Sequence, residues 1–250
     1  AASINTIGGA GNLGNVISNN TVGVGISLGA TANEILGNRI GTNAAGTSAI
    51  PNQTGVVING ANNNKIGNGT PERVNLISGN AENGIEIIQT TGNSVKGNKI
   101  GVTMSLTPLG NGGHGIVVRD SPGTLIGGEL ANEGNIVCNN SGNGILVETT
   151  AANPANRILG GPPTTIQGNH IGVTLDTFAM GGIITGPNGL TGIVSKAIGV
   201  KIGGTGAGAG NSVGANAGPG IQIEGPAAES NEVLGNFIGA IRNAQGAILA

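Results

Sequence analysis

The chain of 250 residues has 51 glycines, only two phenylalanines with no tryptophan or tyrosine, and 9% charged residues. A net charge of −2 without a basic cluster argues against a nucleic-acid partner, since phosphates need a basic surface and bases need aromatic platforms. No apolar run approaches the roughly 20 residues that cross a bilayer, and the positive mean hydropathy argues against disorder. We therefore expect an ordered protein with a core of small and β-branched side chains.

Two short motifs alternate along the chain. The first, Asn-x-Ile/Val-x-Gly-Asn-x-Ile-Gly, is complete at residues 33–41, 93–101 and 231–239. The second is Gly-Ile/Val-x-Ile/Val/Leu, which recurs with a step of about 30 residues, the length of one unit in a stacked array. Its copies begin at Gly25, Gly55, Gly84, Gly115, Gly144 and Gly220. Because the repeat runs from end to end, residues 1–250 are predicted to form a single solenoid domain.

The step widens once, between Ile145 and Ile193. The extra residues include Pro162-Pro163 and Pro187, which break regular structure. We predict a loop insertion at about residues 162–190 that bulges from one coil.

Within each unit the apolar residues alternate with period two, which is typical of strands and not of helices. Three inward columns are predicted. The first contains Ile26, Val56, Ile85, Ile116 and Ile145. The second contains Ile35, Ile66, Val95, Ile126, Ile158, Ile202 and Val233. The third contains Ile17, Ile40, Ile77, Ile100, Val137, Ile171, Val213 and Ile238.

Asparagines fall at the corners between these columns. Asparagine tolerates the left-handed conformation of a tight corner, and its amide can bond the equivalent amide of the next layer. One structural ladder is predicted at Asn15, Asn38, Asn75, Asn98, Asn135, Asn169, Asn211 and Asn236. A second corner is predicted at Asn33, Asn64, Asn93, Asn156 and Asn231.

Segments such as Asn5-Thr-Ile-Gly-Gly9, Asn64-Lys-Ile-Gly67 and Val74-Asn-Leu-Ile-Ser-Gly-Asn80 give the chain a family resemblance. It resembles the right-handed parallel β-helix repeat proteins of the pectate-lyase-like superfamily, in particular secreted or surface-displayed bacterial members. The resemblance implies an all-β, right-handed, single-stranded parallel β-helix (β-solenoid) with three strand faces and a secreted, extracellular or cell-surface location. The repeats predict about eight coils with uncapped ends. A fold does not by itself assign an activity.

Enzymes of that superfamily act on acidic polysaccharides, with paired carboxylates or a calcium site beside a basic residue. This chain has two aspartates, Asp120 and Asp176, in different coils, and it lacks the Asn-Thr-Asp, Asp-Asp and Arg-Ile-Lys signatures of the hydrolases. Gly113-His114-Gly115 matches their Gly-His-Gly element, but His114 stands where Asn83 and Asn143 stand in other units, so we interpret it as a corner residue. We expect no catalytic site, no metal and no cofactor.

The other reactive side chains receive structural interpretations. His170 is expected to be outward and solvated. Arg119 and Asp120 are expected to form an exposed ion pair, with orientation of a substrate as the alternative. Cys138 takes the place of Ser78 in the repeat and is interpreted as structural, with a reactive thiol as the alternative. Sequons occur at Asn19, Asn52, Asn68 and Asn139.

Two surfaces are candidates for association. An outward apolar stripe at Val57, Val117, Leu146 and Val194 predicts a lateral interface, unless loops fold over it. An end interface is predicted at Ile4, Ile7, Ile241, Ile248 and Leu249.

We hypothesise a non-catalytic extracellular structural protein that self-associates head to tail into a fibre or sheath. The alternative is the stalk or passenger segment of an adhesin that binds glycans through loops such as residues 162–188. A polysaccharide lyase or hydrolase is the third hypothesis. The expected partners are further copies of the chain and glycans, without nucleic acid or membrane insertion.

Overall fold

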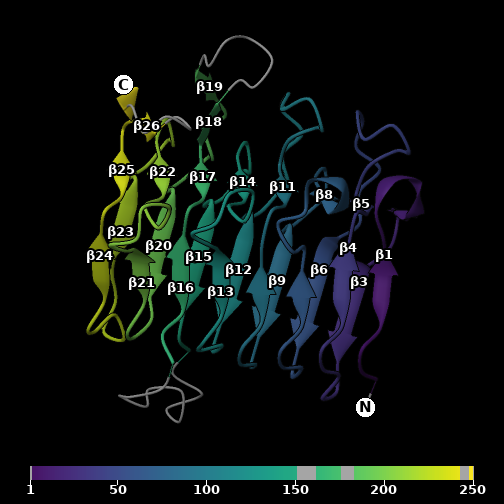
Figure 1. Cartoon of the computed structure of the whole chain (residues 1–250), viewed down its shortest axis with the longest axis horizontal. Helices are drawn as coiled ribbons and strands as arrows, with labels where there is room; N and C mark the ends of the chain where they lie inside the picture. Colours follow the sequence, from purple (N-terminus) through teal and green to yellow (C-terminus); the bar gives the residue numbers. More distant parts are fainter. Residues whose placement is uncertain (1, 151–161, 176–182, 243–247, 250) are drawn as a thin grey trace.

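The computed structural model describes residues 2–150, 162–175, 183–242 and 248–249. The chain forms a right-handed parallel β-helix whose coils follow one another along the long axis, from the N-terminus at one end to the C-terminus at the other (Figure 1). The described coils pass through three parallel sheets, which we call sheets 1, 2 and 3 after their first strands; the last of them has strands in sheets 1 and 2 alone. The predicted fold class is confirmed.

The strand order in each sheet follows the chain. Sheet 1 contains β1 (Thr6–Gly8), β4 (Glu34–Leu36), β7 (Lys65–Ile66), β10 (Ser94–Val95), β13 (Leu125–Gly127), β16 (Thr165–Gln167), β21 (Lys201–Gly203) and β24 (Glu232–Leu234). Sheet 2 contains β2 (Val16–Ile17), β5 (Arg39–Ile40), β8 (Leu76–Ile77), β11 (Lys99–Ile100), β14 (Ile136–Val137), β17 (His170–Ile171), β22 (Ser212–Val213) and β25 (Phe237–Ile238). Sheet 3 contains β3 (Val22–Ser27), β6 (Thr54–Asn59), β9 (Ile85–Ile88), β12 (Ile116–Arg119), β15 (Ile145–Glu148), β20 (Ile193–Lys196) and β23 (Ile221–Ile223).

Four further described strands form two pairs, each of which follows a strand of sheet 2. Strands β18 (Val173–Leu175) and β19 (Ile183–Thr185) are antiparallel, as are β26 (Ile241–Arg242) and β27 (Ile248–Leu249). Two single-turn 3-10 helices, η1 (Gly11–Leu13) and η2 (Pro71–Arg73), lie in corners between sheets 1 and 2.

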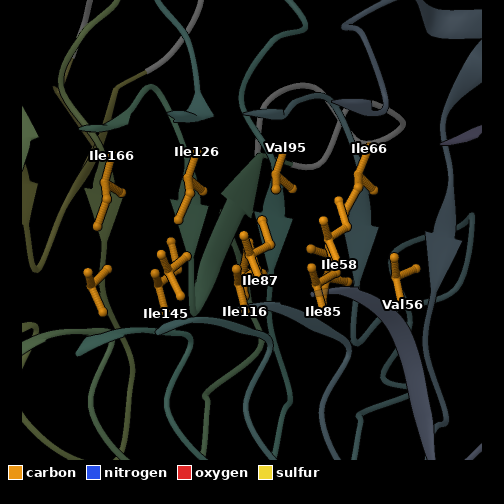
Figure 2. Close-up of a cluster of buried hydrophobic side chains, with 14 of the residues drawn as sticks. Val56, Ile58, Ile66, Ile85, Ile87, Val95, Ile116, Ile126, Ile145 and Ile166 are labelled. Carbon is orange, nitrogen blue, oxygen red and sulfur yellow. The ribbon is translucent and has the colours of Figure 1, made fainter. Parts of the chain in front are cut away.

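The core consists of the stacked inward columns. Parallel pairing places Ile116 between Ile85 and Ile145, and all three side chains are fully buried. Figure 2 shows the column of sheet 1 facing that of sheet 3 across the interior. Each fully buried isoleucine contributes about 1.5–3 kcal/mol through removal of its surface from water. Aliphatic stacking therefore supplies the stability that an aromatic core supplies in other proteins.

Two predicted columns need one correction each. In the first column Val24, and not Ile26, pairs with Val56, because Ile26 pairs with Ile58. The second column changes at Ile158. The structure places Ile166, not Ile158, between Ile126 and Ile202, and Ile166 is fully buried. Ile158 and Asn156 lie outside the described residues. The third predicted column is paired in register at every step, from Ile17 to Ile238.

The predicted loop insertion at residues 162–190 is also corrected. Strands β16 and β17 lie inside that range and occupy regular places in sheets 1 and 2, because Ile166 and Ile171 fill inward positions. Among the described residues of this range, only the antiparallel pair of β18 and β19 departs from the coil. The prolines at 162–163 therefore precede a strand and do not mark a continuous loop.

The predicted asparagine ladder is continuous through all eight members. At its centre, the backbone N and the Nδ2 of Asn98 donate to Oδ1 of Asn135, at 3.0 and 2.9 Å. Asn135 repeats the same two bonds to Asn169, at 3.0 and 2.9 Å. The other steps are made by Asn15, Asn38, Asn75, Asn169 and Asn211 as donors.

Two more corners are stacked in the same way. One ladder joins Asn5, Asn33, Asn64 and Asn93. It stops at Asn93, whose Nδ2 donates to Oγ1 of Thr90. A third ladder, which the sequence analysis missed, joins Asn20, Asn52, Asn80, Asn111, Asn140, Asn188 and Asn216. The sequon residue Asn52 is fully buried in this third ladder.

The coils alternate between two kinds. In coils that begin with β4, β10, β16 and β24, the corner from sheet 1 to sheet 2 is short, as between Ile35 and Asn38. In coils that begin with β1, β7, β13 and β21 the same corner is long, as between Ile66 and Asn75. The corner from sheet 2 to sheet 3 alternates in the opposite sense, short between Asn75 and Asn80 and long between Asn98 and Asn111. The structural repeat is therefore two coils.

Candidate functional site: a groove on the outer face of sheet 2

A groove of about 950 Å³ lies on the outer face of sheet 2. Its floor consists of the outward side chains of five consecutive strands, which are paired in register. These residues are Lys99, Ile136, His170, Ser212 and Phe237. The groove therefore runs along the axis of the β-helix.

Two rows of loops form the walls. Long corners from sheet 1 to sheet 2 contribute Thr70 and Pro71, then residues 128–132, then residues 207–208. The long corner from sheet 2 to sheet 3 contributes Met104 and Leu106 on the opposite side. Because long corners alternate between the two sides, the groove receives a wall loop on one side or the other in successive coils. The two-coil repeat thus forms the groove.

Much of the surface of the groove is apolar. Leu130 and Met104 stand at its rim with 71% and 39% of their surface exposed, and Ile136 is half-buried on the floor. Volumes up to about 1,000 Å³ with mostly apolar walls and a few polar groups are typical of ligand sites. The geometry suits an extended ligand that lies along the axis.

Three basic residues occupy the outer face of sheet 2 in alternate coils: Arg39, Lys99 and His170. Nζ of Lys99 donates to the carbonyl oxygen of Met104, and burial lowers the pKa of Lys99. The expectation that His170 is solvated is wrong: it is half-buried, and burial lowers its pKa. Its Nδ1 atom is buried and has no hydrogen-bond partner in the described part of the chain.

Five basic residues elsewhere in the described part of the chain pair with glutamates of a neighbouring coil. The pairs are Lys65–Glu34, Lys96–Glu133, Arg119–Glu148, Lys196–Glu224 and Lys201–Glu232. These half-exposed bridges contribute little each to stability, since water screens them. They leave the basic residues of sheet 2 as a distinct group.

His114 is a corner residue, as the sequence indicates. Its backbone N donates to Oδ1 of Asn83 at 2.7 Å, and its Nδ1 accepts the backbone N–H of Asn143 at 2.8 Å. Oδ1 of Asn143 in turn accepts the N–H of Thr191 at 3.0 Å. Nδ1 of His114 thus accepts a backbone N–H of the next coil, as the Oδ1 atoms of Asn83 and Asn143 do. This requires a neutral imidazole with its proton on Nε2. Burial, the largest effect, lowers its pKa.

We predict that His114→Asn makes the protein less sensitive to mild acid. Because the pKa values of His114 and His170 are lowered on folding, the unfolded chain binds more protons, and stability falls as pH drops below the ordinary histidine value of 6.5. Asparagine can keep both corner bonds without a titrating group. Melting temperatures measured between pH 7.5 and 5 should decline less steeply in the variant. An unchanged slope would contradict this role of His114.

The predicted Arg119–Asp120 ion pair is not formed. Nε of Arg119 bonds Oε1 of Glu148 at 2.7 Å, whereas Asp120 is buried and accepts the N–H and hydroxyl of Thr150, at 2.9 and 2.6 Å. Successive side chains at a strand end point to opposite faces, so the two cannot easily meet. His114 precedes β12 in sheet 3 and Asp120 follows it, so neither lies in the groove.

The lateral interface is corrected as well. Val57 is half-buried, and Val117, Leu146 and Val194 are 1%, 7% and 3% exposed, so they form no accessible stripe. Two residues further along the same strands, the same face carries the long side chains of Arg119, Glu148 and Lys196. Side chains of this length cover apolar neighbours with their methylene groups.

Of the residues predicted for an end interface, Ile4 is 83% exposed and Ile7 packs partly buried against the core. Ile241 pairs with Leu249 and Arg242 with Ile248 in the antiparallel pair of β26 and β27.

Cys138 is buried beside Val102 and Leu106, and burial raises its pKa to about 12. A thiol with that pKa is not a nucleophile at neutral pH, which favours the structural interpretation. Among the described residues, no three His, Cys, Asp or Glu side chains gather in a way that could hold a metal ion. The described part of the chain also has no helix that is long and apolar enough to span a membrane.

No family model matches the chain, and no curated protein matches it. The solved structures that it resembles include the periplasmic alginate epimerase AlgG, with 17% identity and a TM-score of 0.47 over 87% of this chain and 36% of that chain. A double mutant of the same epimerase gives 16% identity and a TM-score of 0.47, over 95% of this chain and 39% of that chain. This chain thus spans well under half of those proteins, and the likeness is confined to the backbone path.

Proposed function

We propose that this protein is a non-catalytic, exported β-helix that binds an extended glycan in the groove on sheet 2. The observation that carries the proposal is the groove itself, with a floor of five consecutive strands and loops on both sides. A chain of sugars presents apolar ring faces and hydroxyl groups in turn. The apolar rim of Leu130 and Met104 and the polar floor groups of Lys99, His170 and Ser212 complement these two properties.

Isothermal titration with neutral and acidic oligosaccharides tests this proposal. The double variant Leu130→Ser/Met104→Ser removes the apolar rim from two side chains that are exposed and dispensable for the core. It should weaken binding at least tenfold. The control is Leu190→Ser/Leu28→Ser, which changes two exposed leucines outside the groove and should bind as the parent does. Absence of binding to every oligosaccharide, or equal loss in both double variants, would refute the proposal.

Head-to-tail association into a fibre is a second candidate. Inward residues of the last described coil are exposed, with 38% exposure at Val233 and 57% at Ile238. Another coil of the same kind would cover them and extend the three sheets. Negative-stain electron microscopy should then show filaments that Ile238→Lys abolishes. Separate short rods at all concentrations would remove this candidate.

A further inference from the structure

The two buried side-chain nitrogens that lack a hydrogen-bond partner in the described structure share one surface. They are Nε of Arg39 and Nδ1 of His170, and both belong to the outward column of sheet 2. Lys99 occupies the same outward position on β11, which lies midway between β5 with Arg39 and β17 with His170 in sheet 2. A buried polar atom without a partner costs about 1–3 kcal/mol, so the one at His170, which lines the groove, points to a ligand there. Arg39 is not among the residues that line the groove.

The charged residues on the outer face of sheet 2 also point to a ligand on this surface. The outward column of sheet 2 reads Val16, Arg39, Leu76, Lys99, Ile136, His170, Ser212 and Phe237, which includes no acidic residue. Neither Arg39 nor Lys99 has a carboxylate partner among the described residues, although the other described lysines are paired with glutamates. Lys99 bonds the carbonyl oxygen of Met104 but no carboxylate of the described residues. Such a cation on the floor of a groove is complementary to an anionic ligand, although Glu129 on the wall carries the opposite charge.

The spacing of these groups defines the ligand further. Lys99 and His170 both line the groove and are two strands apart, with Ile136 between them in register. Two strand spacings are about 9.6 Å, which is close to the length of a disaccharide in an extended chain. Polar contacts therefore recur every second sugar, and the intervening sugar lies on Ile136.

We propose that Lys99 and His170 are consecutive contacts for an acidic glycan that carries one acidic group per disaccharide. This inference rests on the proposed glycan-binding function of the groove. Lys99 pairs with the carboxylate of one disaccharide, and the imidazole of His170 bonds an oxygen of the next. The apolar position at Ile136 disfavours a polymer with a carboxylate on every sugar, because the intermediate charge would lose water without gaining a partner.

Three hexasaccharide probes of equal length test the inference by titration calorimetry. They are a hyaluronan oligosaccharide with alternating acidic sugars, an oligogalacturonate with an acid on each sugar, and a neutral cello-oligosaccharide. The alternating probe should bind at least tenfold tighter than both others. Lys99→Met should remove this preference, whereas Lys65→Met on the outer face of sheet 1 should retain it.

The outcomes separate the inference from the function on which it rests. Equal binding of the acidic and neutral probes, tighter binding of the oligogalacturonate, or an undiminished preference in Lys99→Met overturns the inference and leaves glycan binding standing. Absence of binding to all three probes removes both. Thermal melts of Lys99→Met and Lys65→Met show that a loss of binding does not come from unfolding.

Discussion

Asn135→Asp is expected to destabilise the protein by about 4 kcal/mol at pH 7, because the substitution removes two donated bonds and buries a charge. Asn135 is fully buried at the centre of the ladder. Its Nδ2 donates to the carbonyl oxygen of Val95 at 2.8 Å and to Oδ1 of Asn169 at 2.9 Å. Aspartate has the same shape but would oppose these two oxygens with a third.

The pH dependence identifies the cause. Burial and the facing oxygens raise the pKa of the introduced carboxyl above its unfolded value of about 3.9, so the folded variant binds the extra proton. The variant should therefore recover stability relative to the parent as pH falls from 7 towards 4. Denaturant unfolding at several pH values measures this difference. Asn15→Asp, at the exposed first position of the ladder, is the control and should change stability little. Equal effects at Asn15 and Asn135 would show that the ladder does not hold the corners.

Gly101→Ala is expected to cost more than about 4 kcal/mol, because the change combines a left-handed backbone with a steric clash. Gly101 has φ +80°, and a Cβ atom there would lie 1.9 Å from the carbonyl oxygen of Cys138 in the next coil. Relief of that contact requires two coils to separate at a point where their backbones are hydrogen-bonded. Thermal or denaturant unfolding measures the loss.

Gly60→Ala is the matched control for this substitution. Gly60 also has a positive φ, +61°, but a Cβ atom there meets nothing. Only the conformational cost of about 1 kcal/mol should remain. If the two alanine variants lose the same stability, close stacking of coils at Gly101 is not what restricts that position.

The inward columns and one ladder could be predicted because the residues that form them recur at nearly fixed intervals. Ile35, Asn38 and Ile40 keep the same spacing as Val95, Asn98 and Ile100, since a short corner allows no variation. The third ladder was missed because its members follow corners of unequal length. Asn80 follows Asn75 closely, whereas Asn111 is far from Asn98, so no fixed interval reveals it.

The groove could not be predicted from the outward residues alone. The sequence shows that Lys99, Ile136 and His170 share a column, but side chains of one column are solvated unless loops rise beside them. A usable signal was present in the alternation of short and long corners. It places loops on both sides of sheet 2, and these loops partly bury His170, which the sequence analysis had placed in water.

Hydrogen-exchange mass spectrometry with and without a bound oligosaccharide tests the location of the ligand most directly. The proposal predicts slower exchange in the wall loops at residues 67–74, 102–109, 128–134 and 204–210, which flank sheet 2. Corners that connect sheet 3 to sheet 1, such as residues 89–92, should exchange at the same rate with and without the oligosaccharide. Protection confined to those other corners, or to the two end coils, would contradict the assignment of the groove as the binding site.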